Sequence, residues 1–279
     1  MKFKKVLVFG GTHGNEWTGI GIVENYRDYF QKKYPNLTLE FILANPEAYK
    51  INKRFKDEDL NRAFQFLNED RKNSYEHVRA REIRELITSE DCYVIDLHTT
   101  TSNMGKTIII SDYHPYNLQL CSRLKEKIAG CKMIGSPDPG KKYLASQTKF
   151  GLILEVGPTP NGLINPIVME ETLLLLDQIL AEISANENSE KGSLEVYEEI
   201  QNVNYPTNSR GEISSYIHSS FQGKDFQPVK GDYTAFRSFQ QQDIRLKTSE
   251  ELYPIFINEA AYYPQQLAFT LCRKTILTF

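Results

Sequence analysis

Residues 6–16 read VLVFGGTHGNE, and this stretch decides how the rest of the chain is interpreted. A short apolar run without polar alternation is typical of a strand that is covered on both faces of a sheet. The glycines after it indicate a tight turn into a helix that begins near Glu16. The stretch therefore predicts a buried first strand with His13 just beyond its carboxyl end.

The first two-thirds of the chain repeats this pattern of short strands and helices. Further strands are expected at Leu39–Ala44, Tyr93–Leu97, Thr107–Ile110 and Leu152–Val156. Helices are expected between them, at Glu16–Tyr34, Tyr75–Ser89, Pro115–Ala129 and Pro166–Ala185. In the second helix, Val78, Ile83, Leu86 and Ile87 form an apolar stripe at helical spacing. Strands that alternate with helices predict an α/β fold with a mostly parallel sheet flanked by helices.

A change of composition divides the chain near its last third. Residues 185–193 read ANENSEKGS, a polar stretch typical of a linker. Short β-rich runs follow it, separated by Gly, Pro, Asn and Asp, at Glu195–Val203, Ile213–His218, Thr234–Phe236, Tyr253–Asn258 and Phe269–Ile276. We therefore expect one α/β domain over residues 1–188 and a smaller β-rich domain over residues 189–279.

Composition excludes several classes of protein. The 279 residues carry 33 Lys and Arg against 36 Asp and Glu, which argues against a protein that coats nucleic acid. The cysteines, Cys92, Cys121, Cys131 and Cys272, are scattered, as in a reducing compartment. The apolar runs are too short for a secretory signal or a membrane span. We expect a cytoplasmic protein with neither nucleic acid nor membrane as a partner.

Side chains suited to chemistry stand at or just after the carboxyl ends of several predicted strands. They are His13, Arg54, His98 and Glu155. The carboxyl ends of strands in an open α/β sheet form the ligand crevice, so these side chains should meet at one edge. Glu16, three residues after His13, would join them.

Two histidines and a carboxylate suggest a metal site. His13 and Glu16 alone favour a simpler interpretation, a helix-capping carboxylate beside an unrelated imidazole. With His98 they would hold zinc and leave one position open, as in catalytic sites. Glu155 lies between Leu154 and Val156, an apolar setting that raises the pKa of a carboxyl toward the range of a general base.

The other functional candidates and the remaining histidines have simpler contexts. Residues 54–62 read RFKDEDLNR, and arginines in such a loop bind carboxylates or stabilise an oxyanion, unless the loop is merely solvated. We expect His77 on an exposed helix face, His114 at a helix start and His218 in the β-rich domain, none of them as ligands.

Five motifs together resemble one known family. They are GGTHGNE at 10–16, DLNR at 59–62, DLHTTTSNMG at 96–105, EVGP at 155–158 and NEAAYY at 258–263. In this order they resemble the aspartoacylase and succinylglutamate desuccinylase family of zinc amidohydrolases, which is related to the zinc carboxypeptidases. The resemblance covers both expected domains. It implies a zinc-carboxypeptidase-like domain over residues 1–188 and a C-terminal domain that partly covers the active-site channel.

The resemblance also implies a role for each candidate. It assigns one Zn²⁺ per subunit to His13, Glu16 and His98, and makes Glu155 the base that activates the attacking water. Arg54 would polarise the scissile carbonyl and stabilise the oxyanion. The substrate-binding residues would be Asn61, Arg62, Tyr143 and Tyr262, the first two on the amino-acid carboxylate. Dimers are common in the family, so the resemblance also allows a homodimer.

Two departures concern the substrate side chain. The pattern for aspartate-derived substrates has an Arg four residues after Tyr143, where this chain has Gln147. A Lys expected soon after Tyr262 and Tyr263 is replaced by Pro264, Gln265 and Gln266. Both missing cations would have met a second carboxylate, unless Lys141, Lys142 or Lys149 replaces them.

The expected function is zinc-dependent hydrolysis of an N-acyl-L-amino acid, with N-acetyl-L-aspartate as the first candidate substrate. Neutral, aromatic or succinylated N-acyl amino acids are alternatives. A protein whose metal site only binds a ligand is another, although it would have no need of Glu155. A dinucleotide-binding protein is disfavoured because residues 10–14 are not G-x-G-x-x-G and Asn45-Pro46 follows the second strand where an acidic residue is expected.

Overall fold

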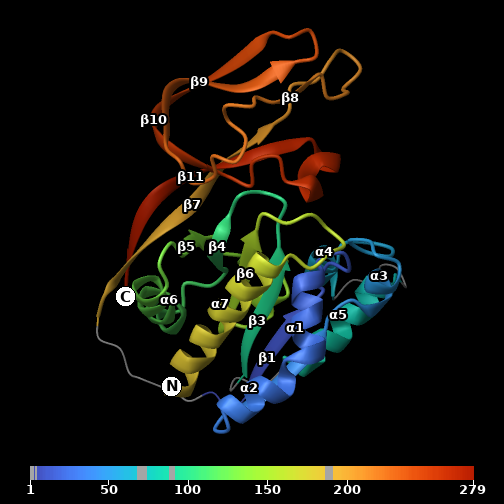
Figure 1. The fold of residues 1–279 in the computed structure, drawn as a ribbon, viewed down its shortest axis with the longest axis vertical. Coiled ribbons are helices and arrows are strands. Elements are labelled where there is room, and N and C mark those ends of the chain that lie inside the picture. The colour runs from blue at the N-terminus through green and yellow to red at the C-terminus, as the bar shows by residue number, and fades with distance from the viewer. Residues whose placement is uncertain (1–2, 4, 68–73, 88–91, 186–190) are drawn as a thin grey trace.

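The computed structural model describes residues 3, 5–67, 74–87, 92–185 and 191–279. One sheet runs through it in the order β2-β1-β3-β6-β4-β5-β7-β11-β10-β9-β8 (Figure 1). Its first strands are β1 (Lys5–Gly10), β2 (Thr38–Leu43), β3 (Cys92–Thr99), β4 (Gly105–Ile110), β5 (Lys132–Gly135) and β6 (Gly151–Gly157). The remaining strands are β7 (Ser193–Asn204), β8 (Ser215–Ile217), β9 (Val229–Ser238), β10 (Asp243–Ile255) and β11 (Leu267–Thr278).

The centre of the sheet is parallel, as the sequence predicts. Strands β2, β1, β3 and β6 run in the same direction, and β4 is antiparallel to β6. Every residue of β3 is buried, which explains the consecutive apolar residues at its start, Cys92–Ile95. Strand β5 was not predicted, because four residues carry too little periodicity to identify a strand.

Helices cover both faces of this part of the sheet. The longer ones are α1 (Trp17–Asn25), α2 (Arg27–Lys33), α5 (Tyr75–Leu86), α6 (Pro115–Lys127) and α7 (Pro166–Ala185). Helices α1, α2, α6 and α7 share one apolar core with the sheet, and α5 packs in the core on the other face (Figure 1). The single helix expected over Glu16–Tyr34 is wrong, since Tyr26 (φ −107°, ψ 3°) leaves helical geometry and divides it into α1 and α2.

Only half of the apolar stripe expected for helix α5 is buried, namely Ile83 and Ile87. Val78 and Leu86 are exposed, whereas Glu76 and His77 are buried. The prediction of an exposed His77 is therefore wrong. This side of the helix is buried because the Glu76 carboxylate accepts hydrogen bonds from the backbone N–H groups of residues 56–58 at 2.6–3.2 Å. The expected end of this helix at Ser89 lies outside the described residues.

The C-terminal strands extend the same sheet and add a core of their own. Strand β7 is parallel to β5 and antiparallel to β11, so the β-rich part is joined to the α/β part edge to edge. Its own core includes Tyr205, Phe236 and Phe269. The expected boundary at residues 188 and 189 lies outside the described residues. In the part of the chain that the structure describes, no helix is long and apolar enough to cross a membrane.

Candidate metal centre and pocket

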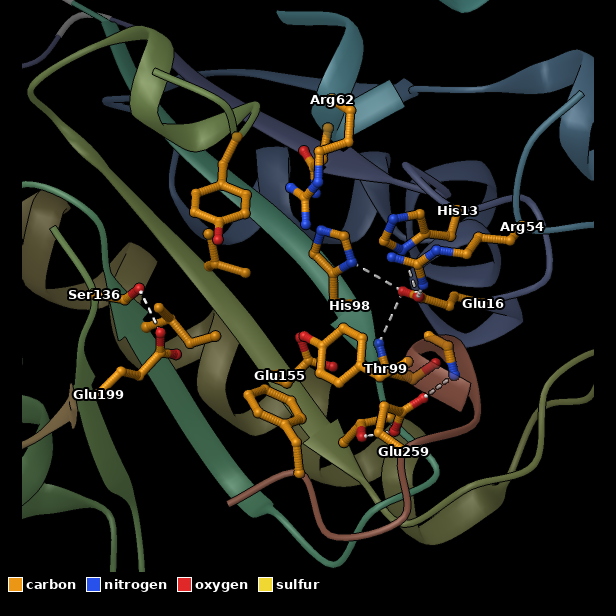
Figure 2. Close-up of a pocket in the computed structure, with 18 residues that line it drawn as sticks. His13, Glu16, Arg54, Arg62, His98, Thr99, Ser136, Glu155, Glu199 and Glu259 are labelled. Atoms are coloured by element: carbon orange, nitrogen blue, oxygen red, sulfur yellow. Dashed lines mark hydrogen bonds and ion pairs between the residues drawn. The ribbon is translucent and has the colours of Figure 1, made fainter. Parts of the chain in front are cut away.

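Every site residue predicted from the sequence lines one pocket at the carboxyl ends of β1, β3 and β6 (Figure 2). These residues are His13, Glu16, Arg54, Asn61, Arg62, His98, Tyr143, Glu155 and Tyr262. They come from loops and strands spread over most of the sequence. The order of the strands in the sheet therefore brings together the side chains that were expected to meet at one edge.

His13, Glu16 and His98 form a compact buried cluster. The two Glu16 carboxylate oxygens lie 2.6 Å from Nδ1 of His13 and 3.0 Å from Nδ1 of His98. One potential ligand atom from each residue lies within 4.8 Å of the others. Three ligands of these types in one buried place match what zinc uses in catalytic sites.

The turn after β1 brings the cluster together. At Gly10 a Cβ would lie only 2.2 Å from the carbonyl oxygen of Gly19, so a glycine is required for α1 to pack this closely on the strand end. Gly11 adopts a φ of +71°, which favours glycine. The Glu16 N–H donates to the His13 carbonyl at 3.1 Å, which holds both side chains on one tight turn. His98 lies within β3, since that strand runs two residues beyond its predicted end.

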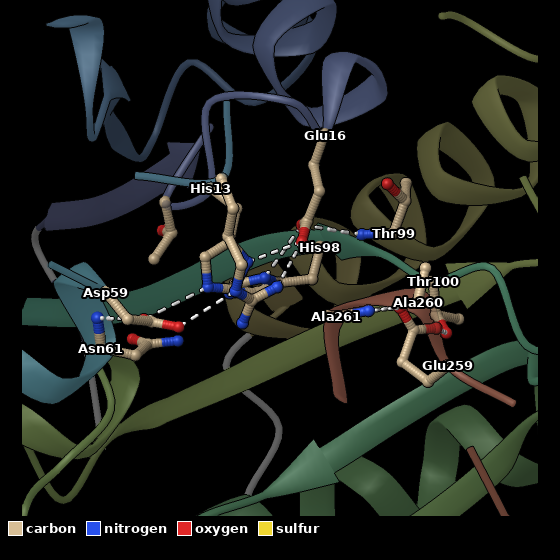
Figure 3. A network of polar contacts seen from close by, with 12 residues as sticks. His13, Glu16, Asp59, Asn61, His98, Thr99, Thr100, Glu259, Ala260 and Ala261 are labelled. Atoms are coloured by element: carbon tan, nitrogen blue, oxygen red, sulfur yellow. Dashed lines mark hydrogen bonds and ion pairs between the residues drawn. The ribbon is translucent and has the colours of Figure 1, made fainter. Parts of the chain in front are cut away.

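Two aspartates lie behind the imidazoles. Asp96 Oδ2 lies 2.8 Å from His98 Nε2, and its Oδ1 accepts a hydrogen bond from the Thr12 hydroxyl at 2.7 Å. Asp59 Oδ1 lies 3.4 Å from His13 Nε2 (Figure 3). The hydrogen bond to Asp96 fixes the ring of His98, whereas Asp59 lies near His13 Nε2 without a hydrogen bond to it. Nδ1 of both histidines is directed at Glu16. No role was predicted for either, although Asp96 is two residues before His98 and so shares its face of the strand.

The electrostatics of the cluster favour an additional positive charge. Burial alone would raise the pKa of Glu16, but His13 and His98 hold it below its ordinary value. Burial would lower the pKa of His98, but Asp96 and Glu16 raise it well above its ordinary value. A proton or a metal ion on the cluster is therefore stabilised by the surrounding carboxylates.

Glu155 lies beside this cluster on the neighbouring strand. It is paired in register with His98 across β3 and β6. Burial raises the pKa of Glu155 to about 8, and the carboxylates of Glu16 and Glu259 act in the same direction. A carboxyl with a pKa in this range can exchange a proton near neutral pH. The apolar setting inferred from its sequence neighbours is thus accompanied by nearby negative charge.

The loop of residues 54–62 is fixed by hydrogen bonds at both ends. Arg54 Nε donates to Asp59 Oδ2 at 3.0 Å, and Arg54 Nη1 lies 3.7 Å from Glu16. The Asn61 amide oxygen accepts from the Leu144 N–H at 3.0 Å, which leaves its NH₂ group to bind an acceptor. The Arg62 guanidinium lies 5.6 Å from the centre of the Tyr143 ring. This loop is therefore held in place and is not merely a solvated segment.

The C-terminal part contributes one wall of the pocket through Glu259, which was not predicted. Its carboxylate accepts from the N–H of Thr101 at 2.8 Å and of Ser102 at 3.2 Å. It also accepts from the hydroxyl of Thr100, which lies beside it in Figure 3. These bonds anchor the turn after β10 to the loop after β3. They bring the short helix with Tyr262 to the pocket.

The wall expected to hold a second carboxylate contains no lysine. Gln147 is turned away, since its Nε2 donates to the carbonyls of Lys141 at 2.6 Å and Tyr143 at 3.0 Å. Lys141, Lys142 and Lys149 do not line the pocket, and Gln265 lines only the wider space outside it. Ser136 and Glu199 line the pocket on the side away from His13 and Glu16 (Figure 2). Neither was predicted, because both lie in or beside strand pairings that the sequence alone does not indicate.

Comparisons with known proteins agree with this geometry. The family model described as the succinylglutamate desuccinylase/aspartoacylase catalytic domain matches residues 2–183, and the AstE/AspA barrel-sandwich hybrid domain matches residues 192–274. A probable aspartoacylase of Trichodesmium erythraeum is 33% identical over 98% of both chains. An N-acyl-aromatic-L-amino acid amidohydrolase (carboxylate-forming) of Xenopus laevis is 34% identical over 97% of this chain and 94% of its own.

A solved structure is similar over the whole length. Murine aminoacylase 3 superposes with a TM-score of 0.91 at 29% identity, covering 100% of this chain and 97% of its own. Both parts of the chain therefore have counterparts in one architecture. The chain belongs to the succinylglutamate desuccinylase/aspartoacylase family.

Proposed function

We propose that the protein hydrolyses the amide bond of an N-acyl-L-amino acid in a zinc-dependent reaction, releasing a carboxylate and the free amino acid. The observation that carries this proposal is the convergence of a His–Glu–His cluster, a carboxyl with a raised pKa and two arginines in one pocket. The names of the relatives, aspartoacylase and N-acyl-aromatic-L-amino acid amidohydrolase, support the same reaction class.

The proposed ligands of one Zn²⁺ are His13, Glu16 and His98. They fit because both Nδ1 atoms face the Glu16 carboxylate, while the Nε2 atoms are directed to Asp96 and Asp59. When bound, zinc polarises a carbonyl and lowers the pKa of water. A thiolate is not required, which agrees with the burial of all four cysteines.

Glu155 is the proposed general base. Its carboxylate takes a proton from the attacking water and later passes it to the leaving amine, which must be protonated to depart. A pKa raised to about 8 makes the carboxylate more basic than an ordinary glutamate. Its position in register with His98 places it next to the metal ligands.

The arginines are the proposed anchors for the substrate's negative charges. Arg54, 3.7 Å from Glu16, lies where it can stabilise the oxyanion that develops on the scissile carbonyl. Arg62 and the free NH₂ of Asn61 are suited to the α-carboxylate. Tyr143 and Tyr262 close the remaining sides of the pocket.

The substitution Glu155→Gln tests this proposal. It should retain stoichiometric zinc and lower kcat by about 10²- to 10⁴-fold, the usual contribution of a general base. Glu198→Gln on β7 is a matched control, since Glu198 accepts a hydrogen bond from the Tyr113 hydroxyl at 3.0 Å and does not line the pocket. An undiminished rate in the Glu155 variant would show that Glu155 is not the base.

N-acetyl-L-aspartate is the substrate that the names of the relatives suggest. The pocket wall described above provides no lysine for its side-chain carboxylate. Measuring kcat/KM for N-acetyl-aspartate, N-acetyl-phenylalanine, N-acetyl-leucine and N-succinyl-glutamate separates the alternatives. Highest kcat/KM on N-acetyl-aspartate would support an aspartoacylase.

A further inference from the structure

Glu199 lies in the pocket on the side away from the metal cluster. Figure 2 shows Ser136 and Glu199 together on that side, and His13 and Glu16 on the other. Glu199 belongs to β7, and Ser136 immediately follows β5, to which β7 is paired. The residue lines both the inner pocket and the wider space outside it. It is therefore accessible to a ligand along the whole approach to the metal cluster.

Apart from the proposed base Glu155, Glu199 is the pocket carboxylate with the weakest internal partners among the described residues. Glu16 is held by two imidazoles, and Glu259 by several hydrogen bonds from the loop after β3. Glu199 has one long hydrogen bond, 3.4 Å from the Ser136 hydroxyl. Among the described residues, no Lys or Arg forms an ion pair with it. A carboxylate without a cation partner in a protein pocket is free to bind one from a ligand.

The nearest positive charges in the pocket are already engaged elsewhere. Arg54 is bound to Asp59, and Arg62 lies over the Tyr143 ring. The negative charge of Glu199 nevertheless reaches the substrate-binding space. Burial raises the pKa of both Tyr143 and Tyr262, the two proposed substrate-contacting tyrosines, and the charge of Glu199 adds to this effect. For Tyr262 the charge of Glu155 adds more than that of Glu199.

We infer that Glu199, assisted by Ser136, forms the side-chain subsite and selects N-acyl amino acids whose side chain ends in an ammonium group. This inference rests on the proposed function and names its substrate class. An ammonium would form a charge-assisted hydrogen bond with the carboxylate. A side-chain carboxylate, as in N-acetyl-aspartate, would be repelled by a like charge in a partly desolvated space. The N-acylated diamino acids are therefore the predicted substrates.

The test compares ammonium substrates with neutral isosteres on the zinc-loaded enzyme. Nα-acetyl-L-2,4-diaminobutyrate is matched by N-acetyl-L-norvaline, and Nα-acetyl-L-ornithine by N-acetyl-L-norleucine. At least one ammonium substrate should exceed its isostere in kcat/KM by about tenfold or more, the size expected for a hydrogen bond to a charged group. Glu199→Gln should reduce that ratio by about tenfold, mainly through KM.

Glu198→Gln controls for the loss of one negative charge on the same strand and should leave the ratio unchanged. The inference is overturned if the wild-type ratio is one or below, or if Glu199→Gln does not change it. Either result leaves the proposed function intact, provided that the neutral isosteres are hydrolysed and that Glu155→Gln abolishes the hydrolysis.

Failure of the proposed function would be recognised separately, because no member of either pair would then be hydrolysed. In that case calorimetry on the Glu155→Gln variant still measures binding of the same pairs. Tighter binding of the ammonium member, lost on adding Glu199→Gln, supports the subsite. Equal binding of both members overturns it.

Discussion

The two sides of the pocket differ in how their charges are satisfied. The metal wall, defined as His13, Glu16, His98 and Glu155, is backed by Asp59 and Asp96, and its ligand atoms face one another. The side-chain wall, defined as Ser136 and Glu199, has a carboxylate with one long hydrogen bond. A wall whose groups converge on one point is suited to hold an ion. A wall with an unsatisfied charge is suited to discriminate among ligands.

Removing a ligand from the metal wall should have the largest effect. His98→Ala should lose stoichiometric metal, and turnover with it by about 10³-fold or more, because the remaining pair no longer provides the usual set of three protein ligands. Elemental analysis and a turnover assay on the same preparation measure both quantities. His218→Ala, in the β-rich part and bonded to Ser220, is the matched control. Full zinc content in His98→Ala would contradict the proposal that the metal wall is the side of the pocket that holds the ion.

Altering Asp96, the hydrogen-bond partner of His98, should have an intermediate effect on zinc binding. Asp96→Asn keeps the size of the side chain but alters the partner of His98 Nε2, and the affinity for zinc should fall by about 10- to 100-fold. Competition with a chromophoric chelator gives the affinity, and circular dichroism checks that the variant is folded. An unchanged affinity would mean that Asp96 only helps to pack β3.

The smallest expected effects are on the stability of the fold. Removing the charge of a paired carboxylate should lower the stability, whereas removing the charge of an unpaired carboxylate should not. Burial tends to raise the pKa of Glu182 on α7, but Lys127 and Arg123 lower it below the ordinary 4.5. Its ionised form therefore stabilises the fold above that pH, and this contribution is lost as the pH falls through the folded pKa. Glu182→Gln should cost about 1 kcal/mol or less at pH 7, since the pair is partly solvated.

Glu199 provides the opposite case in the same experiment. Glu199 is exposed on β7, but the pocket around its carboxyl partly desolvates it and raises its pKa. Its ionised form is therefore disfavoured in the folded protein, and any stabilising contribution is lost as the pH rises. Glu199→Gln should therefore leave the urea midpoint at pH 8 unchanged or higher, whereas Glu182→Gln lowers it. A lower midpoint for Glu199→Gln would identify Glu199 as a structural residue and remove the contrast between the walls.

The metal wall could be predicted from the sequence, and the side-chain wall could not. His13, His98 and Glu155 each stand at the end of a strand that its own apolar run identifies, and the parallel sheet then brings them together. Glu199 reaches the pocket only because β7 pairs with β5. That pairing joins a four-residue strand to one far along the chain, and no local pattern indicates it.

Polar burial explains the other differences from prediction. Glu76 is buried because it satisfies three backbone N–H groups of the loop that carries Arg54 and Asp59, and His77 is buried beside it. Glu259 is buried because it anchors one part of the chain to another. Hydrophobic periodicity cannot identify such residues, since their burial depends on the hydrogen-bonding needs of distant backbone.

Zinc titration of the chelator-stripped protein tests the central proposal most directly. Hydrolysis of a neutral N-acetyl-L-amino acid is followed as zinc is added in sub-stoichiometric steps. We predict that the stripped protein is inactive and that activity rises linearly until one zinc per chain is bound, then stays level. Hydrolysis by the stripped protein at the rate of the zinc-loaded protein would contradict zinc-dependent catalysis at His13, Glu16 and His98.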